Sequence, residues 1–421
     1  MNMLKTTTML VLVFTAIRAY NQTPAVVTDI CKMIEQKSFI KAKQFYEKER
    51  KHIPAAYQYY FSACLNNSFN KLQESENSIN KLLKQKQPLP DTLMVALYEI
   101  RKDNAVKRYH YHEAAAAVGT LLNNYRQYLS PEKLKELQND FKLWSSLENI
   151  PPQTILIKDN TILGIRGDKV GLKNLMVSNG IDSVSFVFDT GANISTIAKS
   201  VAKKMLMNII ASDIKITAIT GKQVAAQLAV CKKLLIGNIE LHNAVFLVFD
   251  DIDLSFQQID YHINGILGFP VIEAMKEIQI TEDGYFKVSR QKSSGHASAN
   301  LALDGLIPLI FIGEDPFTFD TGADHSLFYR PYYLANQQSI TNNYKPASIN
   351  FGGAGGGRSV SGYQIAASFK IDGKQVHLPN VDVLTENVKN EKGIYGNIGQ
   401  DVIRQFSSMT LNFDQMFIHF N

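Results

Sequence analysis

The chain has 421 residues, of which 45% are hydrophobic and 20% charged, and this balance excludes a wholly disordered or fibrous protein. The length predicts about two to four folding units. The net charge of +5 results from 44 Lys and Arg against 39 Asp and Glu. Because no dense basic stripe carries this surplus, we expect no nucleic-acid partner.

Residues 1–19 resemble a secretory signal peptide. Lys5 precedes an apolar run from Met9 to Ile17, and Ala19 supplies a small residue after which cleavage can occur. The run is too short to span a bilayer, and no later stretch approaches about 20 continuous apolar residues. We therefore expect a secreted or periplasmic chain with no stable membrane span in its mature form, while Arg18 beside the cleavage site leaves an uncleaved anchor open.

The three cysteines, Cys31, Cys64 and Cys231, lie outside any C-x-x-C or Cys/His ligand pattern. Three thiols cannot all pair within one chain, so neither a disulfide scaffold nor a zinc site is indicated. A Cys31–Cys64 bridge and unpaired buried thiols are equally compatible with this pattern.

Helical patterns occupy residues 22–150, which predicts an all-α domain. Apolar residues recur at three- and four-residue spacing between Ala55 and Leu65. The polar pair Asn66-Asn67 is predicted to end that helix.

Further helices are predicted over residues 91–104 and 112–128, and Ser130-Pro131 is typical of the start of another. Alternating small and large apolar residues from Ala114 to Tyr125 resemble tetratricopeptide-type helical repeats, whose period is about 34 residues. A generic helical bundle explains the same pattern equally well.

The sequence pattern changes at Pro151-Pro152, after which short β-branched and aromatic runs alternate with Gly and Asn turns. Strands are predicted over residues 155–157, 175–177 and 184–188, and Asn179-Gly180 is typical of a hairpin turn. The remainder of the chain is therefore predicted to be mainly β.

A small, polar segment at residues 291–300 divides this β region. A packed element is difficult to build from its Ser, Gly, Ala and Asn residues, so we interpret it as a linker. The β region is thus predicted to contain one unit at residues 153–290 and a second at residues 301–421.

The β region contains an internal duplication. Phe188-Asp189-Thr190-Gly191-Ala192 recurs as Phe319-Asp320-Thr321-Gly322-Ala323, 131 residues later. The same offset relates Gly265-Ile266-Leu267-Gly268 to Gly396-Asn397-Ile398-Gly399, so the last glycine follows the Asp by 79 residues in both copies. One Asp-Thr-Gly can arise by chance, whereas two copies with equally spaced partners indicate a duplicated functional unit.

These duplicated motifs resemble those of the aspartic peptidases, specifically the retropepsin-like branch, over about residues 153–421. The resemblance implies a two-lobed, pseudo-twofold all-β acid-protease fold in which the two Asp-Thr-Gly loops meet at the axis. With the helical domain preceding these lobes, we expect the whole chain to be a multidomain α+β protein.

The chemistry of such enzymes requires aspartates in pairs. Two carboxyl groups within about 3 Å cannot both ionise, so they share one proton and act as one base and one acid. The resemblance makes Asp189 and Asp320 this catalytic pair, which activates a water molecule for peptide hydrolysis and requires no metal or organic cofactor.

The neighbouring residues of each loop receive supporting roles from the same resemblance. Thr190 and Thr321 are expected to hydrogen-bond across the axis and fix the loops. Gly191 and Gly322 are expected to let the backbone approach the carboxyl groups, which a Cβ would obstruct.

The resemblance also predicts two glycine-containing flaps that close over bound peptide. Residues 351–357, which include Gly352 and Gly353, resemble a retroviral flap tip, and Gly221 occupies the matching place after the first Asp. A phosphate loop is the competing interpretation, but its Lys-Ser/Thr ending and following helix are both missing.

Two further positions carry predictions. Ala192 and Ala323 stand where the pepsin-like branch commonly has a serine that hydrogen-bonds a carboxylate, so the pair is expected to titrate at higher pH and to act at weakly acidic to neutral pH. Asp324 matches an acidic residue that contacts the substrate backbone in the retroviral pattern, whereas Asn193 stands there in the first copy. An asymmetric substrate cleft is expected.

We therefore expect an aspartic endopeptidase that acts on peptide or protein substrates. The alternative is a non-catalytic peptide-binding protein whose helical domain recruits a protein partner. In the enzyme, the helical domain is interpreted either as a recruitment or scaffolding module or as a propeptide that covers the cleft until it is removed.

Overall fold

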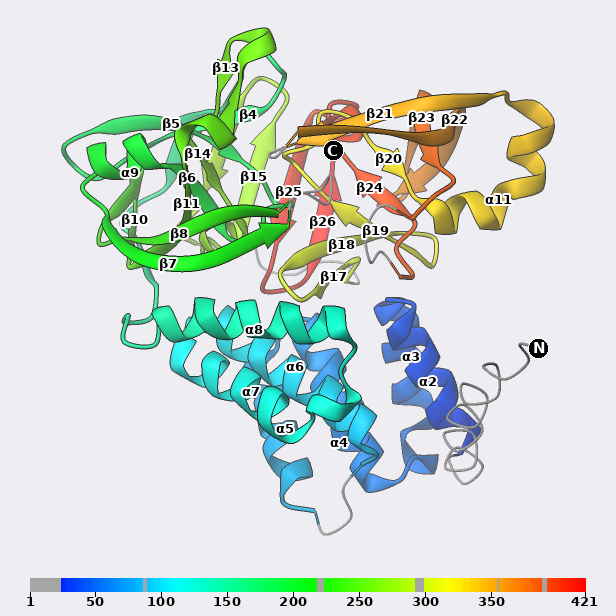
Figure 1. Cartoon of the computed structure of the whole chain (residues 1–421). Coiled ribbons are helices and arrows are strands. Elements are labelled where there is room, and N and C mark those ends of the chain that lie inside the picture. The colour runs from blue at the N-terminus through cyan, green and yellow to red at the C-terminus, as the bar shows by residue number, and fades with distance from the viewer. Residues whose placement is uncertain (1–23, 86–88, 218–222, 292–298, 354–355, 388–391) are drawn as a thin grey trace, which may run out of the picture.

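The computed structural model describes residues 24–85, 89–217, 223–291, 299–353, 356–387 and 392–421. Within these ranges a helical region is followed by a larger β region (Figure 1). The signal peptide predicted at residues 1–19 lies outside the described residues.

The helical region is built from consecutive helices that pack against their neighbours, as α4 does on α5 and α6 on α7. Ile30, Phe61 and Ile79 are fully buried in its core. The helices are α2 (Ala25–Glu35), α3 (Phe39–Glu49), α4 (Ala55–Ser68), α5 (Leu72–Leu83), α6 (Asp91–Lys107), α7 (Tyr111–Asn124) and α8 (Pro131–Ser146), with 3-10 turns at Arg50–His52 and Arg126–Tyr128.

The predicted end of α4 at Asn66-Asn67 is wrong, because the helix continues to Ser68. Asn67 is buried, and its side chain donates to Asn104 Oδ1 at 2.9 Å and accepts from Lys107 Nζ at 3.1 Å. A polar residue can lie inside a helix bundle when its hydrogen bonds are satisfied. The polar pair therefore does not interrupt the helix.

The start of α8 follows the prediction. The Ser130 side chain accepts a hydrogen bond from the Lys133 amide at 3.1 Å, and Pro131 occupies the first turn. The preceding helix α7 ends at Asn124, and only a 3-10 turn continues the predicted helix to Tyr128.

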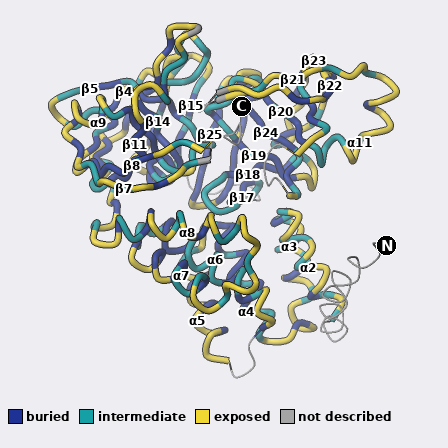
Figure 2. The backbone as a smooth tube through the Cα atoms, viewed as in Figure 1, coloured by how far each residue is buried: buried dark blue, intermediate teal, exposed yellow. Residues whose placement is uncertain are grey.

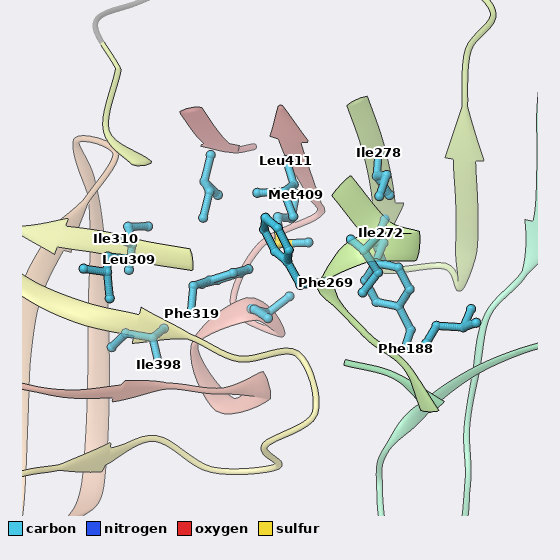
Figure 3. Close-up of a cluster of buried hydrophobic side chains, with 14 of the residues drawn as sticks. Phe188, Phe269, Ile272, Ile278, Leu309, Ile310, Phe319, Ile398, Met409 and Leu411 are labelled. Carbon is cyan, nitrogen blue, oxygen red and sulfur yellow. The ribbon is translucent and has the colours of Figure 1, made fainter. Parts of the chain in front are cut away.

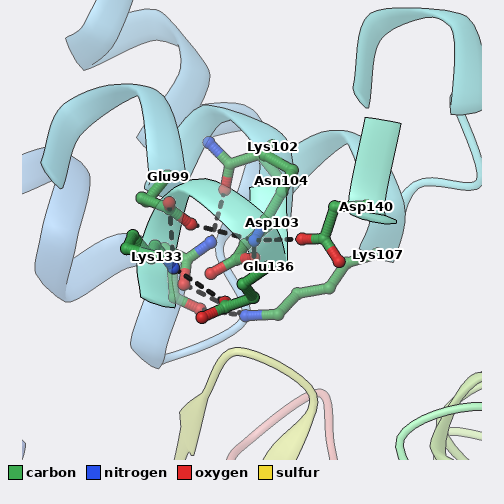
Figure 4. A network of polar contacts seen from close by, with 9 residues as sticks. Glu99, Lys102, Asp103, Asn104, Lys107, Lys133, Glu136 and Asp140 are labelled. Atoms are coloured by element: carbon green, nitrogen blue, oxygen red, sulfur yellow. Dashed lines mark hydrogen bonds and ion pairs between the residues drawn. The ribbon is translucent and has the colours of Figure 1, made fainter. Parts of the chain in front are cut away.

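A half-buried polar network joins α6 to α8 (Figure 4). The Lys102 ammonium lies 2.9 Å from Glu99, 3.3 Å from Asp140 and 3.6 Å from Asp103, and Lys133 lies 3.1 Å from Glu99. Burial alone lowers the pKa of Lys102, but the surrounding carboxylates, Asp103 foremost, raise that pKa well above its ordinary value. Lys102 therefore stays charged and holds the two helices together.

The first half of the β region forms an eleven-stranded sheet in the order β1-β10-β9-β4-β5-β14-β6-β11-β8-β7, with β3 paired to β4. The predicted strands correspond to β1, β4 and β5, and Asn179-Gly180 forms the turn between the last two. The elements are β1 (Thr154–Ile157), β3 (Arg166–Gly167), β4 (Lys173–Ser178), β5 (Ser183–Phe188), β6 (Ser195–Ala198), α9 (Lys199–Lys204), β7 (Asn208–Thr217), β8 (Gln223–Cys231), β9 (Leu234–Ile236), β10 (Ile239–His242), β11 (Ala244–Phe249) and β14 (Gly265–Leu267).

The second half forms an eight-stranded sheet in the order β17-β18-β19-β24-β20-β23-β22-β21. Its elements are β17 (Leu301–Asp304), β18 (Ile307–Ile312), β19 (Asp315–Phe319), β20 (Leu327–Phe328), α11 (Arg330–Asn343), β21 (Pro346–Gly353), β22 (Gly356–Ile371), β23 (Lys374–Leu384), β24 (Gly396–Ile398) and α12 (Gln400–Ile403).

A five-stranded sheet, β2-β16-β15-β25-β26, connects the two halves, because β15 from the first half pairs antiparallel with β25 from the end of the chain. A short hairpin, β12-β13, precedes β14. These elements are β2 (Thr161–Gly164), β12 (Ser255–Phe256), β13 (Tyr261–His262), α10 (Phe269–Ala274), β15 (Glu277–Thr281), β16 (Tyr285–Val288), β25 (Ser408–Asn412) and β26 (Phe417–Phe420).

The two duplicated motifs lie in the same strand arrangement in both halves. β5 runs parallel to β14, which is antiparallel to β6, and β6 runs parallel to β11. In the second half β19 runs parallel to β24, which is antiparallel to β20, and β20 runs parallel to β23. The motif spacing in the sequence thus corresponds to the same local topology.

One apolar core extends through both halves. Figure 3 shows Phe188 and Ile272 on one side, Phe319 and Ile398 on the other, with Met409 between them. Figure 2 shows buried residues concentrated within these sheets and exposed residues along the outer hairpins and helix faces. The core therefore holds both motif loops in one packed body.

The helical region packs directly on the β region. Phe39 and Phe69 belong to the core cluster of the sheets, and Leu137 and Trp144 of the helical region share a second cluster with Ile214 of β7. Figure 1 shows α8 lying along the β7–β8 hairpin. The two regions are therefore joined by buried apolar contacts as well as by the chain connection.

Helix α11 was not predicted within the region after residue 153, which is mainly β as expected. Pro331 lies in its first turn, Ile340 is buried, and Tyr333 stacks on Tyr363 of β22 at 5.8 Å between ring centroids. In the described part of the chain, no helix is both long and apolar enough to cross a membrane.

Candidate active site

Each Asp-Thr-Gly loop begins directly after a central strand, β5 or β19. The Asp189 amide donates to the Leu267 carbonyl at 3.1 Å, and the Asp320 amide donates to the Ile398 carbonyl at 3.0 Å. These bonds tie the loops to β14 and β24, which contain the second duplicated motif. Both aspartates are therefore fixed by neighbouring parallel strands.

The structure brings the two aspartates together across the loops. A Cβ built on Gly322 would lie 2.3 Å from Asp189 Cγ, and one built on Gly191 would lie 2.6 Å from Asp320 Cγ. Real Cβ atoms do not approach so closely, so only glycine lets each carboxyl group lie against the opposite loop. Each carboxyl group therefore lies within the loop that carries the other.

The threonines lock the loops together through reciprocal hydrogen bonds. The Thr190 amide donates to Thr321 Oγ1 and the Thr321 amide to Thr190 Oγ1, both at 3.0 Å. Thr190 Oγ1 donates to the Phe319 carbonyl at 2.8 Å, and Thr321 Oγ1 to the Phe188 carbonyl at 2.9 Å. Each threonine is 1% exposed, so these four bonds are shielded from water.

Different donors hold the two carboxyl groups. Asp189 Oδ1 accepts from the amides of Gly191 at 2.8 Å and Ala192 at 3.1 Å. Asp320 Oδ1 accepts from the Gly322 amide at 2.8 Å, and its Oδ2 accepts from Asn397 Nδ2 at 3.2 Å. The site is therefore asymmetric in its hydrogen bonding although its loops have the same sequence.

The pKa of Asp189 is raised well above its ordinary value. Burial is the largest cause, and the charge and hydrogen bond of Asp320 add to it, while the Gly191 and Ala192 amides oppose it. Two adjacent carboxyl groups in such a position favour the state in which they share one proton. The pair can thus supply an acid and a base at the same pH.

Serines six residues after each aspartate form hydrogen bonds that hold the loops in place. Ser195 Oγ accepts from the Gly268 amide and Ser326 Oγ from the Gly399 amide, both at 3.0 Å. Ser326 Oγ also donates to Asp401 Oδ1 at 2.6 Å. These bonds fix each loop to the strand that carries the second motif.

Two hairpins, β7–β8 and β21–β22, extend from opposite halves toward the middle of the β region (Figure 1). Gly352 and Gly353 belong to β21, where they pair with Gly357 and Gly356 of β22. They therefore stand beside the hairpin end at residues 354–355, which lies outside the described residues. Gly221 also lies outside them, between β7 and β8.

Asp324 lies at a contact between the two halves. Its carboxylate forms an ion pair with Arg404 and lies 3.2 Å from His325 Nε2. A Cβ built on Gly171 of the first half would lie 2.7 Å from Asp324 Oδ1. The corresponding Asn193 is exposed, so this feature occurs in only one of the two copies.

Asn397 and Thr318 are site residues that the sequence analysis did not select. Asn397 was treated as a match to Ile266 within the second motif, although its polar side chain differs from that residue. This difference in polarity between Asn397 and Ile266 is the signal in the sequence that could have identified Asn397 as a site residue. Thr318 gives no signal by itself, because only the pairing of β19 with β24 brings it beside Asn397.

Neither a metal cluster nor a disulfide is found in the described residues. No group of three or more His, Cys, Asp or Glu there could hold a metal ion. Cys31, Cys64 and Cys231 are free thiols.

Comparison with known proteins gives one family match. Residues 174–271 match the aspartyl protease family model. No curated protein matches the chain. Among solved structures, basic 7S globulin from soybean matches over 62% of this chain and 94% of its own, with 10% identity and a TM-score of 0.39. The stretch that carries Asp189 and the first Gly-Ile-Leu-Gly motif therefore has the sequence pattern of an aspartyl protease.

Proposed function

We propose that the chain is an aspartic endopeptidase that hydrolyses peptide or protein substrates with a water molecule held between Asp189 and Asp320. The observation that carries this proposal is the reciprocal packing of each carboxyl group against the glycine of the opposite loop. The family match supports the proposal for the first loop, and the second loop has the same sequence and the corresponding contacts.

The mechanism follows from one shared proton. The ionised carboxylate removes a proton from the water, whose oxygen attacks the scissile carbonyl carbon, while the protonated carboxyl donates to the carbonyl oxygen. The resulting tetrahedral diol then collapses: one of its hydroxyl protons passes to the carboxylate that acted as acid, the other carboxyl gives the proton taken from water to the leaving nitrogen, and the C–N bond breaks. No covalent enzyme intermediate forms, and neither a metal nor an organic cofactor is required.

The reciprocal threonine bonds support a pseudo-twofold arrangement of two lobes around the aspartates. We assign residues 153–290 to the first lobe, 291–300 to the linker and 301–421 to the second lobe. The β21–β22 hairpin, with Gly352 and Gly353, and the segment around Gly221 are assigned as flaps over bound peptide.

We assign residues 22–150 to a helical domain that remains part of the working enzyme, because its side chains complete the β core. The tetratricopeptide-like repeat and a protein partner for this domain remain predictions from the sequence. Export by the segment at residues 1–19, and hence a secreted or periplasmic location, also remains a prediction.

The proposal is tested by incubating the purified chain with a peptide library and identifying new termini by mass spectrometry. Asp189→Asn and Asp320→Asn should each lower kcat by at least about 1,000-fold, because the pair then lacks either its acid or its base. Asp283→Asn makes the same chemical change at an exposed turn between β15 and β16 and should leave the rate unchanged.

Cleavage that survives both active-site variants would reject the aspartic mechanism. Peptide binding without any cleavage by the wild-type chain would instead favour the non-catalytic peptide-binding protein. The three variants and the wild type should have the same thermal unfolding midpoint within about 3 °C, which separates loss of chemistry from loss of fold.

A further inference from the structure

The two halves of the site differ in one pair of facing residues. In the first half Val187 of β5 faces Ile266 of β14, and in the second half Thr318 of β19 faces Asn397 of β24. An apolar pair in one copy therefore corresponds to a polar pair in the other. Both residues of the facing pair differ between the two halves. The difference therefore affects the interaction between two side chains and not only one position.

Both ends of the Asn397 amide have partners. Its Nδ2 donates to Asp320 Oδ2 at 3.2 Å, and its Oδ1 accepts from Thr318 Oγ1, which also lies 3.3 Å from the Gly396 carbonyl oxygen. Thr318 thus orients the amide so that its N–H group points to the carboxylate. Asn397 is only 8% exposed, so water molecules compete little for the hydrogen bonds of its amide.

An amide N–H group favours the ionised form of the carboxylate that it contacts, because it can donate a hydrogen bond but cannot accept one. Asp320 receives such a bond on each oxygen, from Asn397 and from the Gly322 amide. In the first half Ile266 has no donor to offer, and the two amide donors of that loop both bind Asp189 Oδ1.

We propose that Asn397, oriented by Thr318, is a positioning residue that keeps Asp320 as the ionised member of the pair. Asp320 then accepts the proton from water, and Asp189 carries the shared proton and donates it to the scissile carbonyl oxygen. This assignment rests on the proposed peptidase function and adds the acid and base roles to it.

The other charges near the site are consistent with this assignment. Asp189 faces Asp320 directly, and its raised pKa favours the protonated form. Asp324 is paired with Arg404, and Asp401 accepts hydrogen bonds from Ser326. Lys173, Glu282 and Arg404 line a cavity of about 190 Å³ beside Thr321, where opposite charges are mixed.

The main test replaces the polar pair with the apolar pair of the first half, in the double variant Thr318→Val/Asn397→Ile. Loss of the donor makes ionised Asp320 less stable and raises the pKa at which the pair becomes active. The acidic limb of kcat/KM against pH should therefore move upward by about one pH unit, with about a tenfold loss of rate below that limb. An unchanged or lower midpoint would overturn the proposal.

Single variants at Thr318 supply a matched control. Thr318→Ser keeps the hydroxyl group that orients the amide and should leave the midpoint of the acidic limb in place. Thr318→Val removes the hydroxyl group and should shift the midpoint in the same direction as the double variant, by a smaller amount. Equal midpoints for these two variants would contradict the orienting role of Thr318.

A second readout needs no peptidase activity. Because Asn397 stabilises the ionised pair, the wild type should unfold at a higher temperature than the double variant above the pair's titration, and this advantage should shrink as the pH falls through it. If the wild type cleaves no peptide, the proposed function fails while this measurement still decides the role of Asn397. A Tm difference independent of pH would reject that role.

Discussion

The close approach of two loops requires glycine at particular residues. At Gly322 an added Cβ would meet the Asp189 carboxyl group at 2.3–2.5 Å, and at Gly191 it would meet the Asp320 carboxyl group at 2.6–2.8 Å. Neither carboxyl group can withdraw freely, because backbone amides and the threonine bonds hold both loops. The close packing of the two carboxyl groups thus requires that residues 191 and 322 have no Cβ atom.

We expect Gly322→Ala to displace Asp189 and lower kcat by about 100-fold, since a shift of about 1 Å in a reacting group has an effect of that size. The same overpacking should destabilise the fold by about 1–3 kcal/mol. Peptide cleavage and urea unfolding measure the two effects separately. Gly164→Ala is the control, because a Cβ there meets nothing within 4 Å. A fully active Gly322→Ala variant would contradict the face-to-face arrangement.

Among the site residues, the sequence predicted those that the duplication repeats. Asp189, Asp320 and the adjacent Thr and Gly residues were selected because their identities recur at a fixed offset. Asn397 was not selected, because only residues identical in both copies were selected and Asn397 differs from its counterpart, Ile266. The Ala192 amide that binds Asp189 was also missed, since a backbone donor leaves no trace in residue identity.

One element that connects the helices to the site region is the edge strand β7. Asn139 of α8 accepts from the Lys215 amide at 2.8 Å and donates to the Lys215 carbonyl at 3.0 Å, so its side chain pairs with the strand edge. Lys142 adds an ion pair with Asp213 at 3.0 Å, and Ile214 is fully buried between them. Helix α8 therefore fixes the strand that leads toward residues 218–222.

Asn139→Ala should detach this edge and destabilise the chain by about 1 kcal/mol, because the freed Lys215 groups can bind water instead. The Lys215 amide should then exchange with deuterium faster, while amides of β5 should not change. Lys142→Met serves as the comparison, since its exposed ion pair is expected to contribute less than the two Asn139 bonds. Equal exchange at Lys215 in the wild type and Asn139→Ala would contradict the edge-pairing role.

Helix starts and turns could be predicted where the residues at that point determine the local backbone. Ser130-Pro131 and Asn179-Gly180 set a helix start and a hairpin through their own side chains and backbone angles. Helix α11 was missed because its Tyr and Asn residues carry no amphipathic period and are held by packing on β22 and β23. In both copies 79 residues separate the Asp from the last glycine of the second motif, but the elements between them differ. The helix in the first copy, α9, has six residues, whereas the helix in the second copy, α11, has 14.

Across the whole molecule, polar contacts attach the helical region to the β region at several separated places. Lys37 pairs with Asp304 of β17 at 2.7 Å near one end, and Tyr109 Oη donates to the Pro270 carbonyl of α10 at 2.9 Å in the middle. Asn139 pairs with Lys215 at the other end. Contacts this widely spread, with buried apolar clusters beneath them, favour a permanent structural role over a removable propeptide.

This distinction can be tested by inserting a specific protease site at Pro151-Pro152 and cutting the folded chain there. We expect the two fragments to co-elute in size-exclusion chromatography and to separate only in denaturant, because cutting one connection leaves the polar attachments and the shared apolar clusters intact. A propeptide would behave differently: the helical fragment would dissociate and peptide cleavage would increase. Retained association with unchanged kcat therefore assigns residues 22–150 to the working enzyme, whereas release with a gain in activity assigns them to an inhibitor of it.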